Sequence, residues 1–160
     1  MTIAIAVQTQ GDHDILEYSG PINAEAEVYL TQILSKISQK VKIDLSGVSS
    51  VNSCGVRSWI NFMRELEAKG HEITFEKCAA EVVMQFNMIP SFKGPAKVNS
   101  LFGNYVCDNC GAEREILFES GKNLPASPDD ELEEVICASC SHVMELDELE
   151  EEFFAFLKTA

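Results

Sequence analysis

The chain has 160 residues, 46% of them apolar, and a formal net charge of -14. This charge argues against nucleic acid as a partner, because a nucleic-acid binder neutralises phosphates with clustered Lys and Arg. Nor does any stretch reach the roughly 18 apolar residues of a membrane helix. The start, MTIAIAVQTQ, lacks the positive segment of a signal peptide, so we expect a cytoplasmic protein whose six Cys are thiols or metal ligands.

The first part of the chain alternates between strand and helix patterns. Residues 2–10 and 13–20 alternate apolar and polar side chains, which predicts two strands joined by a turn near Gly11 and Asp12. Helical spacing follows over residues 23–39, with Asn23 as a candidate cap. The residues expected on the apolar face of this helix are Ala24, Val28, Ile33, Leu34 and Ile37.

Four further elements complete this part. Residues 40–45 predict a short strand, and residues 54–68 predict a helix with Val56, Trp59, Ile60, Met63 and Leu66 on its apolar face. Residues 71–77 predict a strand, and residues 79–89 a helix that Pro90 ends. The order β-β-α-β-α-β-α indicates an α/β fold, a mixed sheet with helices packed on it.

Composition and charge both change near residue 95. Residues 1–95 hold 8 basic and 11 acidic residues, whereas residues 96–160 hold 4 and 15. The segment from Pro90 to Ser100 contains two Pro and a Gly, which is typical of a connecting loop. We therefore expect one domain over residues 1–92, a linker over 93–100, and a second domain over 101–160.

Three stretches of the first domain resemble the STAS domain of bacterial anti-sigma factor antagonists. They are SGPIN before the first helix, KIDLSGVSSVNSCGV across the third strand and second helix, and ITFEKCAAEVVMQFNMI at the end. In that family the middle stretch commonly reads Asp-Leu-Ser-Gly and then Asp-Ser-Ser/Thr-Gly-Leu. Ser53 and Gly55 match this second motif, while Asn52 replaces its Asp, Cys54 its second hydroxyl residue and Val56 its Leu.

The resemblance implies a phosphorylation switch at Ser53. In the family this serine is phosphorylated by a partner kinase that is also an anti-sigma factor, and a phosphatase reverses the reaction. A serine at a helix N-terminus also suits this role physically, because the helix dipole favours negative charge there. The alternative is that Ser53 only caps the helix. Asn52 in place of the acidic residue favours a module that binds without being switched.

The same region predicts a protein-binding surface. Candidate contacts beside Ser53 come from the predicted helix, and an ordinary solvated helix face is the alternative for each of them. Cys54 has two further interpretations, a small buried side chain or a redox-active thiol. The candidate contacts are Asn52, Cys54, Arg57, Ser58, Asn61, Arg64 and Glu65.

Four cysteines in the second domain form two CxxC pairs, Cys107 with Cys110 and Cys137 with Cys140. Each pair brings two sulfurs to one centre, and two pairs complete the tetrahedron that structural Zn²⁺ prefers. Alternating segments around each pair predict two hairpins, so we expect a zinc ribbon with His142 outside the ligand set. Local disulfides, unrelated thiols and a thioredoxin-type redox pair are the alternatives.

The last residues, DELEEEFFAFLKTA, predict a terminal helix that begins near Asp147. Its apolar stripe packs either on its own protein or on a partner; the stripe consists of Leu149, Phe153, Phe156 and Leu157.

These patterns together predict a non-enzymatic regulatory protein whose partner is an anti-sigma factor or serine kinase. The alternative is an unphosphorylated STAS scaffold that assembles with itself, as a homo-oligomer, or with a transporter. A third interpretation is a redox protein that uses Cys54 or the CxxC pairs.

Overall fold

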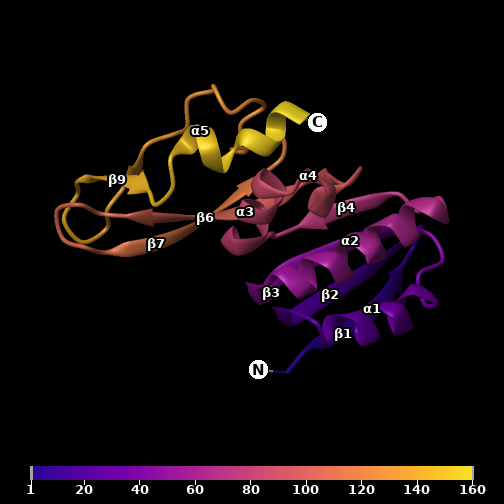
Figure 1. Cartoon of the computed structure of the whole chain (residues 1–160). Helices are drawn as coiled ribbons and strands as arrows, with labels where there is room; N and C mark the ends of the chain where they lie inside the picture. The colour runs from indigo at the N-terminus through magenta and orange to yellow at the C-terminus, as the bar shows by residue number, and fades with distance from the viewer. Residues whose placement is uncertain (1, 160) are drawn as a thin grey trace.

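A computed structural model of the chain describes residues 2–159. Its first sheet has the strand order β1-β2-β3-β4-β5, and only the β1–β2 pair is antiparallel (Figure 1). The turn after β1 has Gly11 at φ 60°, as a tight two-residue hairpin requires. The strands are β1 (Ala4–Gln10), β2 (His13–Ile22), β3 (Lys40–Val51), β4 (Ile73–Glu76) and β5 (Lys97–Val98).

Helices follow the strands of this sheet as the sequence predicted, with changed bounds. The first helix is shorter than expected, because the Asn23 side chain accepts the Glu25 N–H in a turn and helical geometry begins three residues after Asn23. The second begins at Ser53, one residue earlier than predicted. The bounds are α1 (Ala26–Leu34), α2 (Ser53–Ala68), α3 (Ala80–Met88) and α4 (Pro90–Lys93).

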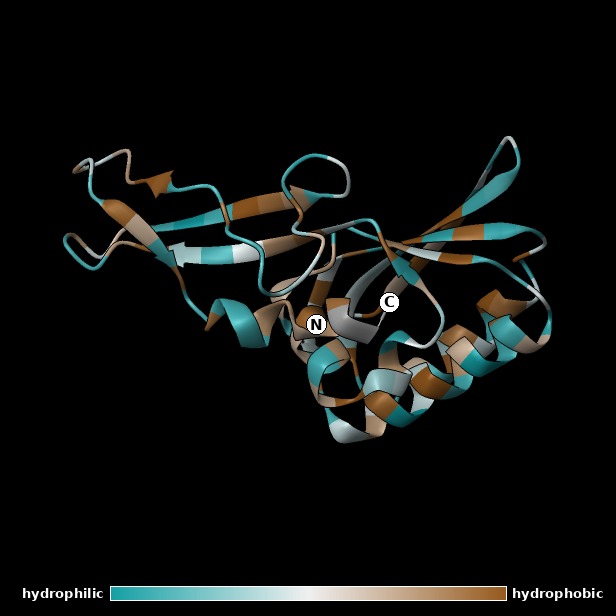
Figure 2. Cartoon of the chain, turned by 90° about the horizontal axis from the view of Figure 1, so that it is seen from above, coloured by the Kyte–Doolittle hydropathy of each residue, from teal (hydrophilic) through white to brown (hydrophobic). Residues whose placement is uncertain are grey.

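The core of this part lies between the sheet and the helices that cover one of its faces (Figure 2). Trp59 of α2 is fully buried and packs against the rings of Tyr18 and Phe75. Its indole N–H donates to the Phe92 carbonyl oxygen at 3.1 Å, which satisfies its polar group. This one side chain therefore joins α2, the sheet and α4.

Residues 93–100, predicted as a linker, are ordered and packed. They include β5, which pairs with β4, and Ala96 and Val98 are buried. The next strand, β6, starts at Ser100 and bridges to Cys78 beyond the end of β4. The linker prediction is wrong at this point, because a strand of two residues is too short to produce a recognisable alternation.

The second part of the chain forms an antiparallel sheet with the order β7-β6-β9-β8. Two hairpins were predicted here, and both are present. A long connection over residues 120–134 separates β7 from β8. The strands are β6 (Ser100–Val106), β7 (Glu113–Glu119), β8 (Val135–Ile136) and β9 (Val143–Leu146).

The C-terminal segment lies across α3 in place of the long helix that was predicted. It forms two short helical turns, α5 (Glu150–Phe153) and η1 (Ala155–Thr159), and Asp147 caps neither. The Asn87 side chain of α3 donates to the Phe153 carbonyl oxygen and accepts the Phe156 N–H, at 2.9 and 2.8 Å. Phe153 and Phe156 are buried, so the predicted stripe does pack on its own chain, except that Leu149 is exposed. Within residues 2–159, no helix has the length and apolar character needed to cross a membrane.

Candidate functional site

The start of α2 is set by Asn52 and Gly55. Asn52 is the cap, because its side-chain oxygen accepts the Gly55 N–H at 2.9 Å. Gly55 lies against the end of β2, where an added Cβ would collide with the Ile22 carbonyl oxygen. The Asn52 N–H donates to the same oxygen at 3.1 Å. The helix therefore begins in direct contact with the sheet.

Ser53 is the first residue of α2, and its side chain is exposed. Since Asn52 provides the cap, the alternative role of Ser53 as the capping residue is wrong. Its hydroxyl makes no side-chain hydrogen bond within the part of the chain that the structure describes. The backbone N–H groups of the first helical turn surround this position, and they favour negative charge. The hydroxyl is thus accessible to a modifying enzyme.

Two adjoining depressions form a groove between α1 and α2, here called the α1–α2 groove. The first, of about 440 Å³, begins at Ser53 and Cys54. The second, of about 520 Å³, continues along both helices and shares Glu27 and Ser58 with the first. The other lining residues are Ala24 and Arg57 in the first, and Leu30, Thr31, Leu34, Asn61, Phe62, Arg64 and Glu65 in the second.

Most of the predicted contact residues meet in this groove. Arg57, Asn61 and Arg64 are exposed and line it. Ser58 was predicted to be exposed but is only 8% accessible, because it lies on the buried side of α2 and its hydroxyl donates to the Cys54 carbonyl oxygen. Cys54 itself is exposed, which contradicts its interpretation as a buried filler.

The α1 side of the groove was not recognised in the sequence. Val28 was assigned to the apolar face of its helix, yet it is 60% exposed, and the buried face consists of Ala26, Leu30 and Ile33. Tyr29 beside it is 38% exposed. Neither Val28 nor Tyr29 lines the groove, and no local pattern in the sequence marks the residues in and just before α1 that do. These are Ala24, Glu27, Leu30, Thr31 and Leu34.

The four cysteines of the CxxC pairs form a single cluster. The Sγ atoms of Cys107 and Cys140 are 3.4 Å apart, those of Cys110 and Cys137 are 3.6 Å apart, and all four lie within 4.8 Å of one another. A tetrahedral site with metal–sulfur bonds near 2.3 Å requires sulfurs about 3.8 Å apart. The residues therefore fit a metal ion with four thiolate ligands.

The two CxxC turns have the same backbone geometry. In the first, the Gly111 N–H donates to the Cys107 carbonyl oxygen and the Cys107 N–H donates to the Ala112 carbonyl oxygen. The Cys137 turn repeats both bonds with Ser141 and His142. Gly111 and Ser141 adopt φ values of 76° and 66°, left-handed geometry that closes each turn.

The surroundings of the cluster favour the thiolate form of Cys140, whereas hydrogen bonds with the other sulfurs raise the pKa of Cys110. The Asn109 side chain hydrogen-bonds to the Cys140 sulfur and, with the backbone N–H of His142, lowers the pKa of this thiol to about 5. His142 is exposed and its Nδ1 lies 3.2 Å from the Cys140 carbonyl oxygen, so it stays outside the group of four sulfurs. Cys78, by contrast, lies in the core, where burial raises the pKa of its thiol.

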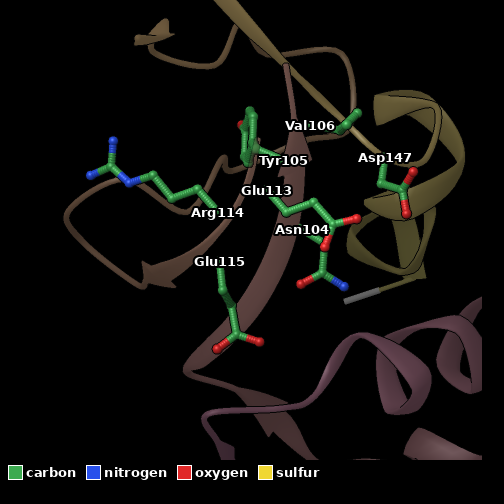
Figure 3. A pocket seen from close by; sticks show the side chains of 7 residues that line it. All are labelled: Asn104, Tyr105, Val106, Glu113, Arg114, Glu115 and Asp147. Atoms are coloured by element: carbon green, nitrogen blue, oxygen red, sulfur yellow. The ribbon is translucent and has the colours of Figure 1, made fainter. Parts of the chain in front are cut away.

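A separate polar pocket of about 330 Å³ lies on the second sheet beside β6 and β7 (Figure 3). Glu113 and Asn104 approach one another there, whereas Arg114 points away from them (Figure 3). Glu113 and Glu115 are exposed, so water screens their charges. We assign no ligand to this pocket.

The fold and these sites define an α/β domain with an accessible helix start, continued by a small sheet that carries four clustered thiols. The sequence model of the STAS domain matches residues 4–96, more than half of the chain. The chain therefore belongs to the STAS domain family.

Two solved structures are among those similar to the chain. The anti-sigma factor antagonist SpoIIAA in its unphosphorylated form is 16% identical, with a TM-score of 0.34 over 45% of this chain and 71% of SpoIIAA. The crystal structure of Mglu is 28% identical, with a TM-score of 0.37 over 45% of this chain and 19% of Mglu. Among curated proteins, no significant match is found.

Proposed function

We propose that the protein is a non-enzymatic regulatory module that binds a protein partner through the α1–α2 groove and releases it when Ser53 is phosphorylated. The partner is an anti-sigma factor or serine kinase, as membership of the STAS family suggests. The exposure of Ser53 at the entrance of the groove is the observation that supports this proposal most strongly.

The groove explains how a phosphate would act. A phosphoserine adds about 1.5 to 2 negative charges at pH 7. Arg57, one turn further along α2, lines the same depression as Ser53, and Glu27 of α1 faces it from the other side. The new charge attracts Arg57 away from a bound partner and repels acidic groups, including Glu27. A partner that covers this end of the groove then loses contacts and gains repulsion.

The proposal includes a structural zinc ion held by Cys107, Cys110, Cys137 and Cys140. Four thiolates occupy every position of a tetrahedral site, so no position remains for a reacting molecule. Such an ion supplies folding free energy to a sheet with a small core. The fit of the four sulfur positions supports this assignment.

The proposal is tested with the full chain as bait in extracts of its native host. The captured partner is purified, and its affinity is compared for wild type, Ser53→Ala, Ser53→Asp and the control Ser50→Asp. Ser50 is also exposed but lies in β3, outside the residues that line the groove. We expect Ser53→Asp to weaken binding about tenfold or more, which corresponds to about 1.4 kcal/mol. Ser53→Ala and Ser50→Asp should bind the partner about as tightly as wild type.

Two results would contradict the switch. One is equal affinity of wild type and Ser53→Asp for the partner. The other is the absence of a phosphate on Ser53 in peptides of the protein isolated from growing cells. Either result, with partner binding retained, favours the unphosphorylated scaffold, for which the neutral cap Asn52 is the supporting feature.

A further inference from the structure

The outer edge of β1 differs from the other sheet edges of the protein. β1 is the first strand of its sheet and pairs only with β2 (Figure 1). Its seven residues, AIAVQTQ, include no charge, Pro or Gly. Proteins usually protect strands in this position with charged side chains, Pro, bulges or a very short strand, because an open edge is a template for another strand.

The remaining edges among the described residues have such protection. At the other side of the first sheet, β5 has only two residues, one of which is Lys97. In the second sheet, β7 carries Glu113, Arg114, Glu115 and Glu119, and β8 again has two residues. β1 is therefore the one long, uncharged edge strand in the described part of the chain.

The register of the β1–β2 hairpin determines which backbone groups point outward. Gln10 and His13 flank the two-residue turn, so they form a hydrogen-bonded pair, and such pairs recur at every second residue. The N–H and C=O groups of Ile5, Val7 and Thr9 consequently face away from β2. No backbone hydrogen bond from another segment of residues 2–159 reaches them.

We infer that a second copy of the chain pairs with this edge, antiparallel about a twofold axis at Val7, so that the two five-stranded sheets become one. A twofold axis at Val7 pairs its N–H and C=O with those of the other Val7, and pairs Ile5 with Thr9 of the other copy. The outward N–H and C=O groups of Ile5, Val7 and Thr9 then all have hydrogen-bond partners in the other copy. An edge strand with an outward-facing residue at its centre is self-complementary, as a symmetric dimer requires.

The side chains are compatible with this pairing. On the open face of the sheet, Ala6 and Gln8 face each other across the axis, and both are exposed and neutral. Small Ala side chains at positions 4 and 6 leave room for the Gln side chains opposite them. No like charges are brought together along the strand, whereas a strand carrying Lys or Glu would repel its own copy.

The interface is short, so the dimer is expected to be weak, with half-assembly at roughly 10–100 μM chain. Each copy also carries a net charge of -14, which opposes association at low ionic strength. Added salt screens this repulsion without weakening the backbone hydrogen bonds. Dimerisation is therefore expected to strengthen as the salt concentration rises.

Sedimentation equilibrium of the full chain tests the inference. The average mass of wild type is expected to rise with concentration, from 17.7 kDa towards twice this value. The double variant Ala6→Lys with Gln8→Lys places like charges opposite each other across the axis, and we expect it to weaken the dimer at least tenfold. The matched variant Ala6→Lys with Gln8→Glu places opposite charges there, and we expect the dimer to be retained.

Positions 6 and 8 are exposed, so we expect both double variants to keep the wild-type fold. Circular dichroism is the control for this. A wild type that remains monomeric up to about 500 μM in high salt overturns the inference. So does a dimer of equal strength in both double variants, because its interface then lies elsewhere on the molecule. Neither result tests the proposed phosphorylation switch, because Ser53 lies outside β1.

Discussion

Asn52 and Gly55 determine how α2 meets the sheet. We expect Asn52→Ala to lower the free energy of unfolding by about 1 kcal/mol, because the Gly55 N–H loses its side-chain acceptor. Urea denaturation measures the change, and Asn61→Ala is the control, an exposed Asn later in the same helix. Equal effects of the two substitutions would contradict the capping role.

Gly55 is required for close contact between α2 and β2. Gly55→Ala places a methyl group against the Ile22 carbonyl oxygen, so the helix must shift or the strand must yield. We expect a loss of about 2–4 kcal/mol, against less than about 1 kcal/mol for Cys54→Ala, the exposed neighbour. A thermally stable Gly55→Ala protein would show that the contact is looser than described.

We expect Asp14 to make the stability of the first sheet and its helices sensitive to acid. It is fully buried, yet the hydrogen bond from the Ser38 N–H, with further bonds from Thr9 and Gln39, holds the pKa of its carboxyl below the usual 3.8. A lowered folded-state pKa stabilises the protein above the unfolded pKa, and this stability is lost as the pH falls through the folded value. We expect the stability difference between wild type and Asp14→Asn to shrink from pH 6 towards about pH 2. A difference independent of pH would contradict this role.

At the scale of elements, the two CxxC hairpins depend on the ion proposed between them. We expect Cys137→Ser to lower metal affinity roughly 100-fold, since an unfilled position weakens a four-thiolate site. Wild type should contain one zinc per chain by elemental analysis, and a chelator should abolish the protection of β6–β9 from amide hydrogen exchange. The control Cys54→Ser should retain the metal. Full protection of metal-free wild type would contradict the structural role.

Elements in which apolar residues recur at a regular spacing were predicted from the sequence. Elements that depend on contacts with distant residues were not. The alternation in β1 and β2 and the apolar stripe of α2 gave the correct elements within a few residues, because buried faces impose these periods. β5 was missed, since its two residues are held by pairing with β4 and not by their own pattern. The C-terminal helix was predicted as one piece, but contacts with Asn87 divide it into two turns.

The candidate sites were likewise predicted where they depend on local sequence and missed where they depend on distant residues. The CxxC spacing predicted the four clustered thiols, because each pair needs only a local turn. Ser53 was considered as the cap, whereas the structure gives this role to Asn52. The sequence does not distinguish the two, because Ser and Asn favour the cap position about equally. The α1 side of the groove is formed by residues distant in the chain, and no local pattern marks Glu27 as a neighbour of Ser53.

For the whole molecule, Asn87 links α3 to the C-terminal segment, in addition to the hydrogen bonds that Glu76, Lys77 and Cys78 make with Ser100. We expect Asn87→Ala to lower the free energy of unfolding by about 1–3 kcal/mol, because two hydrogen bonds to the backbone of the C-terminal segment are lost. The segment should also become easier to cleave by protease. The control is Met88→Ala, an exposed neighbour on α3, and equal protease sensitivity of the two variants would contradict the role.

The long connection over residues 120–134 has a consequence for how the molecule could be assembled. A break near Asp130 leaves Cys107 and Cys110 on one piece and Cys137 and Cys140 on the other, so a zinc ion at the cluster would join the two. β9 would still pair with β6, and Phe154 would still pack on Phe118. Two peptides made separately, 1–130 and 131–160, should therefore reconstitute the native complex when mixed with zinc, and a chelator should separate them again.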